Sequence, residues 1–456
     1  MPGKLTFDEL KQAVQSGDID TVLVVQVDMQ GRLMGKRFHA AFFVESAWEE
    51  THGCNYLLAT DMEMNTVEGY EATSWAAGYG DYVMRPDLST LRRVPWLEAT
   101  ALVLCDVEDH DADGPVAHSP RAVLKRQIAR LEAIGLRPTM ASELEFFLFE
   151  DSFAAAERAG YRDLSLVSAY NEDYHILQTT KEEEVMRAVR NGLYGAGIPV
   201  ECSKGEASAG QEEINVKYDH ALTAADNHVI VKNGVKEIAW SKGRAATFMA
   251  KWNDTSAGSS SHVHQSLQTL DGEPAFYDAE AEHGMSELMR HYLAGLLKYA
   301  DDVTLLLAPN VNSYKRFVAG TFAPTMAVWS LDNRTAGYRL CGAGTKGVRV
   351  ECRVGGSDLN PYLAFAGQIA AGLAGIEEKL ALEPAFEGDA YGAREGMRHV
   401  PSTLRAATEA FDQSAMLRQA LGDDVVDHYV HAARWEQREY DSHVTDWEVR
   451  RGFERS

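Results

Sequence analysis

A chain of 456 residues is too long for one ordinary domain and long enough to bury a large core. Its 44 Lys and Arg residues against 68 Asp and Glu residues give a formal net charge of −24, which argues against nucleic acid and anionic membranes as partners. The five cysteines form no CxxC pair and the N-terminus has no apolar signal-peptide segment, so we expect a cytoplasmic protein without a disulfide framework or a zinc cluster.

The N-terminal part of the chain is predicted to be a small domain that contains β-strands. Its strands are predicted at residues 21–27, 32–38 and 100–107. Turn residues at 28–31 join the first two, and the acidic, turn-rich stretch 108–115 is the best boundary candidate in the chain. We therefore predict two domains, residues 1–113 and residues 114–456.

The second domain is predicted to alternate strands with long helices. Ser119-Pro120 has the order of a helix cap and first turn, and Gly135 ends that helix. Further helices are predicted near 181–195, 220–241, 284–306 and 359–380, and from about 402 to the end. The apolar residues 361–376 are too few to span a bilayer and indicate a core helix.

Four separated segments alternate in character with a period of two residues. They are Glu143–Phe146, Glu212–Asn215, His262–Gln265 and Arg349–Arg353. Successive side chains of a strand point to opposite faces, so we expect each segment to direct its ionisable residues to one face and its apolar or non-ionised residues to the other. Carboxylates gathered in one enclosed space need cations to remain charged. The pattern predicts a curved sheet lined with metal ligands and phosphate-binding arginines.

Six residues are candidate metal ligands, and five of them offer oxygen. They are Glu143, Glu145, Glu206, Glu213, His262 and Glu351. A site rich in carboxylates suits Mg²⁺ or Mn²⁺ better than zinc or copper. A single Glu on a strand is usually solvent-exposed, but the presence of all six beside two histidines and three arginines argues against that alternative.

Basic residues are concentrated in one stretch of this acidic chain. They are Lys315, Arg316, Arg334, Arg339, Lys346, Arg349 and Arg353. Arginine forks match phosphate and carboxylate oxygens, and with two cations they could hold a nucleoside triphosphate and a carboxylate substrate for phosphoryl transfer. The chain has no GxxxxGK[ST] loop, so metal ions must do the work of backbone amides. For any single arginine, a surface salt bridge stays open as an alternative.

Ordered motifs over nearly the whole chain resemble the glutamine synthetase family. They are Asp81–Thr90, Ser142–Phe147, Glu206–Glu213, Ser261–Leu267, Asn312–Arg316, Asn333–Ala336, Arg349–Arg353 and Asn360–Leu363. The resemblance implies an α+β fold, with a small N-terminal β-grasp domain and a catalytic domain whose antiparallel half-barrel sheet is backed by helices. It also implies a homo-oligomer, a dodecamer of two stacked hexamers in which neighbouring subunits share each active site.

The resemblance also assigns roles to residues of this chain. For two or three Mg²⁺ or Mn²⁺ ions per site, it places one at Glu145, Glu206 and Glu213 and another at Glu143, His262 and Glu351. It assigns glutamate's carboxylates to Arg316 and Arg353 with Gly258 and His262 nearby, and the transferring phosphate to Arg334 and Arg339. ATP is assigned to His264, Ser266, Lys346 and Arg349.

Departures from the family pattern bear on the amine substrate. A glutamine synthetase surrounds ammonium with carboxylates, one of them in a Gly-Tyr-Glu-Ala-Pro run. Here the run is Gly320–Pro324, and Phe322 replaces the acid, which removes a charge that stabilises a desolvated cation and leaves an apolar wall. The Asn-Gly pair of the glutamate site has become Ala257-Gly258, which removes one donor to the substrate.

The N-terminal acids complete the predicted amine site. Asp61 is the counterpart of the family's ammonium-site aspartate, with a cap or turn role as the alternative, and Asp81 matches a second acid. Glu63 lies on the same face as Asp61 if the segment is extended. The pattern of departures resembles the γ-glutamyl-amine ligase branch of the family. Within that branch, residues 53–66 most resemble actinobacterial γ-glutamylethanolamide synthetases, with γ-glutamylpolyamine synthetases close by.

The resulting hypothesis is an ATP-dependent ligase that joins glutamate's γ-carboxylate to a primary amine through γ-glutamyl phosphate. A small amine such as ethanolamine is favoured, and a polyamine stays open because Glu63 or Glu68 could anchor a second ammonium group. Three alternatives remain. Phe322 argues against a true glutamine synthetase using ammonia, the N-terminal domain against a guanidino phosphotransferase, and the complete ligand set against a non-catalytic homologue.

Overall fold

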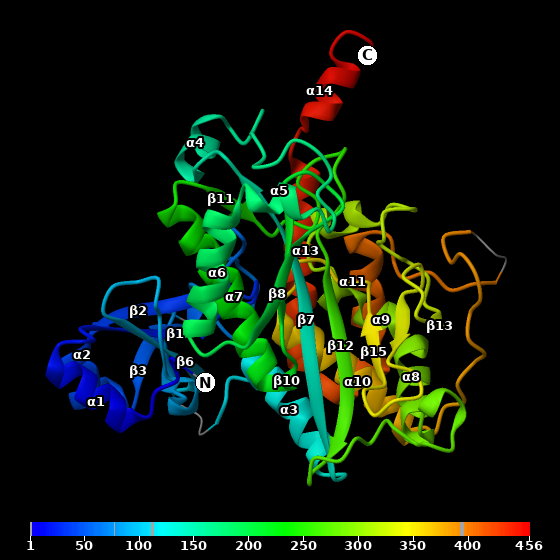
Figure 1. Cartoon of the computed structure of the whole chain (residues 1–456), viewed down its shortest axis with the longest axis horizontal. Coiled ribbons are helices and arrows are strands. Elements are labelled where there is room, and N and C mark those ends of the chain that lie inside the picture. The colour runs from blue at the N-terminus through cyan, green and yellow to red at the C-terminus, as the bar shows by residue number, and fades with distance from the viewer. Residues whose placement is uncertain (1, 77, 111–113, 393–395) are drawn as a thin grey trace.

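Two separate β-sheets organise the chain in the computed structural model, which describes residues 2–76, 78–110, 114–392 and 396–456 (Figure 1). The strands of the first sheet lie between residues 21 and 109, and those of the second between residues 136 and 352. The predicted α+β fold is confirmed. The predicted boundary at 113/114 falls beside residues 111–113, which lie outside the described residues, so the two-domain division stays a prediction.

The N-terminal sheet has the strand order β2-β1-β6-β4-β3, with β5 paired to β6. Its strands are β1 (Thr21–Val27), β2 (Leu33–His39), β3 (Thr51–Cys54), β4 (Asp81–Pro86), β5 (Arg92–Arg93) and β6 (Thr100–Asp109). The turn between β1 and β2 forms as predicted, because the buried Asp28 carboxylate accepts the backbone N–H groups of Gln30 and Arg32. β1 runs parallel to β6, and the other pairs are antiparallel.

Short helices complete the N-terminal part. They are α1 (Phe7–Ser16), α2 (Ala40–Phe42), the π-helix η1 (Phe43–Ala47), and the 3₁₀ turns η2 (Asn55–Leu58) and η3 (Leu88–Thr90). α1 begins with a capping box in which Thr6 and Glu9 satisfy each other's backbone N–H groups. Its buried residues Leu10 and Ala13 belong to a small core with Phe43 and the β1 residue Val24.

The second sheet has the order β13-β14-β15-β12-β7-β9-β8, with β10 and β11 paired to β7. Its strands are β7 (Leu136–Phe149), β8 (Val200–Gly205), β9 (Gln211–Val216), β10 (Asp219–His220), β11 (Ala245–Thr247), β12 (Ser261–Thr269), β13 (Trp329–Leu331), β14 (Tyr338–Cys341) and β15 (Arg349–Cys352). All pairs are antiparallel except β13 with β14. The four alternating segments of the sequence lie on β7, β9, β12 and β15, which are consecutive neighbours.

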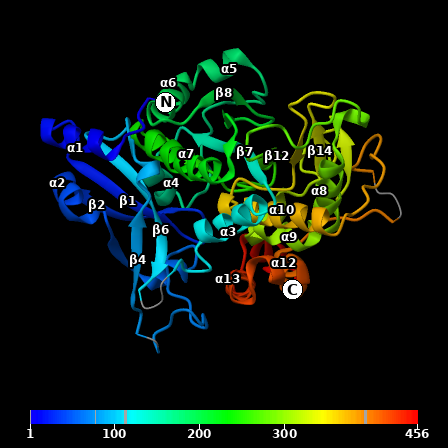
Figure 2. The same cartoon turned by 90° about the horizontal axis from the view of Figure 1, so that it is seen from below.

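Long helices lie beside this sheet (Figure 2). The helices of this part of the chain are α3 (Pro120–Glu132), α4 (Phe153–Arg158), α5 (Ile176–Thr180), α6 (Glu183–Gly195), α7 (Ala221–Ser241), α8 (Glu287–Lys298), α9 (Ala300–Leu307), α10 (Pro361–Glu377), α11 (Leu404–Gln413), α12 (Ala415–Leu421), α13 (Asp423–Ser442) and α14 (Asp446–Gly452), with 3₁₀ turns η4 (Glu282–Gly284) and η5 (Val311–Arg316). α3 and α7 pack against β7, and α10 packs against both helices. No described helix is long and apolar enough to cross a bilayer.

The predicted core helix is confirmed as α10, which is buried from Pro361 to Gly375. It approaches α8 so closely that a Cβ atom at Gly295 would lie 2.2 Å from the Ala371 carbonyl oxygen. The prediction of a single helix at residues 284–306 is wrong. The chain leaves helical geometry at Tyr299 (φ −102°, ψ 17°) and forms α8 and α9, which both pack against α10.

Candidate active site

Strand register brings the ionisable residues of four strands into opposed pairs. On β7, Glu143 lies opposite His262 of β12 and Glu145 lies opposite Glu213 of β9. Glu351 of β15 lies opposite His264 of β12. Directly opposed residues share a face with their Cβ atoms about 5 Å apart, so these pairs must meet as side chains.

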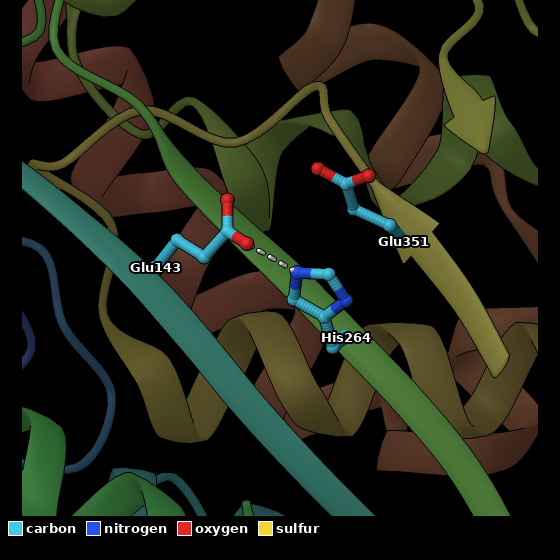
Figure 3. A group of neighbouring side chains, drawn as sticks. All are labelled: Glu143, His264 and Glu351. Carbon is cyan, nitrogen blue, oxygen red and sulfur yellow. Dashed lines mark hydrogen bonds and ion pairs between the residues drawn. The ribbon is translucent and has the colours of Figure 1, made fainter. Parts of the chain in front are cut away.

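One group, the histidine-containing cluster, consists of Glu143, His264 and Glu351 (Figure 3). Each offers a ligand atom, and the three atoms lie within 4.8 Å of one another. His264 Nε2 is 2.9 Å from one Glu143 oxygen. His262 Nδ1 is 3.0 Å from the other Glu143 oxygen and 3.5 Å from Glu351. The structure thus brings both imidazoles to Glu143, and His262 as the metal ligand stays a prediction.

The histidine-containing cluster carries its own compensating charges. Arg339 Nη1 donates to Glu351 at 2.9 Å, and Arg353 contacts the other oxygen of Glu351. Although burial opposes it, nearby His262 and Arg353 lower the pKa of Glu351 to about 2. Burial also opposes ionisation of Glu143, yet hydrogen bonds from His262 and His264 hold the pKa of Glu143 below its usual range. Both carboxylates are therefore anionic at neutral pH.

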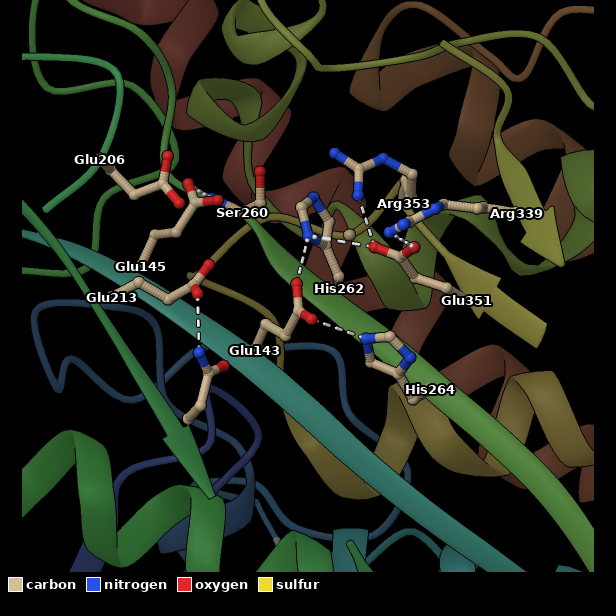
Figure 4. A network of polar contacts seen from close by, with 12 residues as sticks. Glu143, Glu145, Glu206, Glu213, Ser260, His262, His264, Arg339, Glu351 and Arg353 are labelled. Atoms are coloured by element: carbon tan, nitrogen blue, oxygen red, sulfur yellow. Dashed lines mark hydrogen bonds and ion pairs between the residues drawn. The ribbon is translucent and has the colours of Figure 1, made fainter. Parts of the chain in front are cut away.

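A second group, the three-carboxylate cluster, consists of Glu145, Glu206 and Glu213 (Figure 4). Their ligand atoms also lie within 4.8 Å of one another. Glu145 is held in place by the Ser260 N–H at 2.7 Å and by Gln211 Nε2 at 3.2 Å. Glu206 follows β8, and the chain returns to β9 through Gly210, whose φ of +67° favours glycine.

The three-carboxylate cluster lacks the charge compensation of the first. Burial, followed by the charge of Glu206, raises the pKa of Glu145 to about 8. Burial, followed by Glu143 and Glu145, raises the pKa of Glu213 to about 9. Only Lys204 contacts the cluster as a cation among the described residues, through Glu206. The three carboxylates are hard to ionise in this buried place without a nearby positive charge. A hard divalent cation such as Mg²⁺ or Mn²⁺ would supply that charge and prefers oxygen ligands.

Arg316 is a buried arginine with donors to spare. Its Nη2 donates to the carbonyl oxygens of residues 353, 354 and 355 at 3.1, 2.8 and 2.6 Å. Its Nε and Nη1 have no partner within the described chain, and neither does Nε of Arg353. A Cβ atom at Gly258 would lie 2.2 Å from Arg316 Cγ, so only glycine leaves room for this side chain. The unpartnered donors are suited to a substrate carboxylate.

The four residues assigned to ATP lie along one cavity of about 470 Å³. His264, Ser266, Lys346 and Arg349 all line it, and Glu143 lies at the same cavity. Arg349 Nε donates to His264 Nδ1 at 3.2 Å, which leaves His264 Nε2 toward Glu143. The cavity therefore opens onto the histidine-containing cluster, where the phosphates of a nucleotide would meet cations.

Other predicted site residues do not join the clusters within this chain. Asp61 accepts hydrogen bonds from the backbone and side chain of Asn65, which is the turn role stated as its alternative, and it lines a different cavity with Tyr70 and Glu436. Glu63 is exposed, and Asp81 is exposed at the start of β4. Arg334 is exposed as well.

Phe322 is half exposed in a strained backbone conformation, at φ +56°. A left-handed φ costs a non-glycine residue roughly 1–2 kcal/mol, and such strain concentrates at functional sites. Burial raises the pKa of the nearby Tyr391 phenol, and the charges of Arg353 and Arg316 oppose that rise.

Two features escaped prediction. Lys204 is two residues before Glu206 and opposite Glu213, so the strand period alone places it on the ligand face. The expectation that each segment directs its ionisable residues to one face is wrong for β9, because the adjacent Glu212 and Glu213 point to opposite faces and Glu213, the assigned ligand, faces the cluster. Glu212 instead meets Glu172 and Glu182.

The site combines two groups of cation-binding side chains, buried arginines and a nucleotide-sized cavity. This combination is typical of an enzyme that transfers a phosphoryl group to a carboxylate with the help of metal ions. Residues 117–452 match the family model of the glutamine synthetase catalytic domain, and the chain belongs to the glutamine synthetase family. The family predicted from the sequence motifs is confirmed.

The similar proteins include two ligases named for an amine other than ammonia and several glutamine synthetases. The chain is 48% identical over 452 residues to a γ-glutamylethanolamide synthetase of Streptomyces coelicolor, covering 99% of this chain and 96% of that one. It is 38% identical over 445 residues to a glutamate–isopropylamine ligase of a Pseudomonas species, covering 97% of each. Among solved structures, a GmaS–ADP complex matches with a TM-score of 0.85 at 26% identity, covering 97% of this chain and 99% of that one.

Proposed function

We propose that this protein is an ATP-dependent ligase that joins the γ-carboxylate of glutamate to a primary amine. Two relatives similar over nearly their whole length are named for joining an amine to glutamate. The observation that carries the proposal is the combination of both cation-binding clusters with Phe322 at the position of the family's ammonium-site acid. The phosphorylation machinery is complete, while the pocket for the nucleophile has lost a charge.

In the first step a γ-carboxylate oxygen of glutamate attacks the γ-phosphorus of ATP, and ADP leaves. Different residues bind the glutamate, the phosphoryl group and the metal ions. Arg316 and Arg353 hold glutamate's carboxylates through their unpartnered donors. Arg339, with Arg334, stabilises the charge of the transferring phosphoryl group. Mg²⁺ or Mn²⁺, two or three ions held by the two clusters with His262, would neutralise the phosphate oxygens. The product is γ-glutamyl phosphate.

In the second step the amine nitrogen attacks the acyl carbon and phosphate leaves. The ammonium form must first lose a proton, which Asp61 or Asp81 accepts. Phe322 lies against the carbon substituent of the amine, so a small amine such as ethanolamine fits best. Glu63 and Glu68 are the residues that would anchor the second charge of a polyamine. Ammonia, the substrate of a true glutamine synthetase, lacks a carboxylate partner at Phe322.

The placement of Asp61 supports shared active sites. Asp61 lies apart from both clusters of its own chain, in a cavity beside Tyr70 and Glu436. A neighbouring subunit would supply Asp61 to the clusters of the next, as in a ring. We therefore include in the proposal a cytoplasmic homo-oligomer, a dodecamer of two stacked hexamers.

Phosphate release with glutamate, ATP and Mg²⁺ tests the function directly. The panel of acceptors is ammonia, methylamine, ethanolamine, isopropylamine, putrescine and spermidine. Ethanolamine is expected to give the highest kcat/KM, and omission of glutamate should abolish release. Strong turnover with ammonia alone would refute the proposed amine specificity, and no amine-dependent release at all would refute the ligase.

A further inference from the structure

A third group of acids lies outside the site described above. Glu172 precedes α5, Glu182 immediately precedes α6, and Glu212 is on β9. Each offers a carboxylate oxygen, and the three oxygens lie within 4.8 Å of one another. Unlike ordinary acidic surface clusters, all three residues are buried, with exposed fractions of 0%, 4% and 1%. Buried carboxylates at this spacing cannot all be ionised without a counter-charge.

No protein cation supplies that counter-charge within the described residues. The nearby Arg190 donates instead to Ser203 and Glu183. The nearby Lys204 is held by Glu206 on the catalytic side. None of the three acids takes part in an ion pair in the described part of the chain, although the charges of Arg190 and Lys204 are felt at Glu212.

The unpartnered carboxylate oxygens of Glu182 indicate a bound ligand. Both of its carboxylate oxygens are buried and have no hydrogen-bond donor among the described residues. One oxygen of Glu172 and one of Glu212 are also buried without a donor. Only the second oxygen of Glu172 is satisfied by a protein donor, the Ser168 hydroxyl at 2.8 Å. Three oxygens, one from each residue, thus lie within 4.8 Å of one another, where the described residues give Glu182 no donor.

We propose that Glu172, Glu182 and Glu212 bind a divalent cation that prefers oxygen ligands, such as Mg²⁺ or Mn²⁺, at a structural site. All available donors are carboxylate oxygens, which hard cations prefer. The site joins the loop before α5 and the start of α6, which follow one another in the chain, to the strand β9. Because Glu212 and Glu213 are adjacent on β9 and point to opposite faces, this cation fixes the strand from the side opposite the three-carboxylate cluster.

The alternative occupant is a set of shared protons. Burial, followed by the neighbouring carboxyl of Glu172, raises the pKa of Glu182 to about 11 in the absence of an ion. A neutral Glu182 could then donate to one of its neighbours. A neutral acid donates only one proton, so it satisfies fewer of the unpartnered oxygens than a cation does. The two occupants are distinguishable because only the cation scatters X-rays anomalously.

Crystals of the full chain grown with MnCl₂ and without nucleotide provide the test. An anomalous difference peak at the Mn edge, equidistant from the three carboxylates, is the expected result. Elemental analysis of protein dialysed against metal-free buffer should show one Mn²⁺ fewer per chain for Glu182→Gln than for wild type. The matched control is Glu184→Gln, two residues further along in α6, whose side chain is 78% exposed and should leave the metal content unchanged.

The outcome does not depend on the ligase activity. If Glu182→Gln fails to fold, the wild-type anomalous map decides by itself. An empty map between the three carboxylates, with peaks at the catalytic clusters in the same crystal, would overturn the proposal in favour of shared protons. Equal Mn²⁺ content in wild type and a folded Glu182→Gln variant would overturn it as well.

Discussion

At the scale of single residues, Phe322 is the position at which amine choice can be redirected. Replacing it by glutamate, Phe322→Glu, returns a carboxylate to the pocket that receives the ammonium group. We expect kcat/KM for ammonia to rise at least about tenfold, which corresponds to about 1.4 kcal/mol of added stabilisation, while that for ethanolamine falls. Steady-state phosphate release with each amine measures the change.

Phe322→Leu is the matched control, because it removes the ring without adding charge. It should not improve the use of ammonia. If Phe322→Leu and Phe322→Glu changed the ammonia rate equally, the size of the side chain rather than its charge would set specificity, and the electrostatic argument would be wrong.

Gly258 offers a sharper steric test of the glutamate site. In Gly258→Ala the new Cβ atom would lie 2.2 Å from Arg316 Cγ and 2.8 Å from the Ala250 carbonyl oxygen, so Arg316 must move. The expected result is a rise of at least about tenfold in KM for glutamate, with a much smaller change in KM for ATP. Gly452→Ala is the control, because its Cβ atom meets only Ser456 Oγ at 3.5 Å. Unchanged KM for glutamate would show that Arg316 does not bind it.

At the scale of elements, β7 and β9 create a pH-dependent cation site. Without an ion, Glu145 and Glu213 have pKa values of about 8 and 9, well above their unfolded values. Their contribution to the free energy of unfolding is therefore present below about pH 4.5 and is lost as pH rises through 8 to 9. A bound cation takes the place of these protons, so binding releases protons and strengthens as pH rises from 7 to 9.

Calorimetric titration with Mn²⁺ in buffers of different ionisation enthalpy measures this release. At pH 7 the observed binding enthalpy should depend on the buffer, and Glu213→Gln should reduce that dependence. A binding enthalpy that is the same in every buffer would mean that the three-carboxylate cluster is already ionised and that burial does not govern it.

The elements also show what the sequence could and could not predict. Period-two alternation identified β7, β9, β12 and β15, because side-chain direction in a strand is a local property. Their register is set by long-range pairing, so the contact of His264 as well as His262 with Glu143 was not predictable. Alternation was ambiguous at Glu212-Glu213, because adjacent strand residues cannot share a face and both are ionisable. The helix break at Tyr299 had no glycine or proline to signal it.

At the scale of the whole molecule, the separation of Asp61 from its own clusters predicts complementation between subunits. Asp61→Asn and Glu145→Gln should each be inactive alone. Subunits dissociated, mixed in equal amounts and reassembled should recover about a quarter of wild-type activity, because a site is intact when both contributing subunits supply an unaltered residue. Ring composition can be checked by native mass spectrometry. Mixed rings without any activity would show that Asp61 serves its own chain.

The central claim is that the paired clusters activate glutamate by phosphorylating its γ-carboxylate. Isotope transfer tests this most directly. Glutamate labelled with ¹⁸O in the γ-carboxylate is incubated with ATP, Mg²⁺ and ethanolamine, and the released phosphate is analysed by mass spectrometry. One ¹⁸O atom in each phosphate is the predicted result, because the attacking carboxylate oxygen leaves with the phosphoryl group. Phosphate without label, formed while the amide product accumulates, would contradict the account.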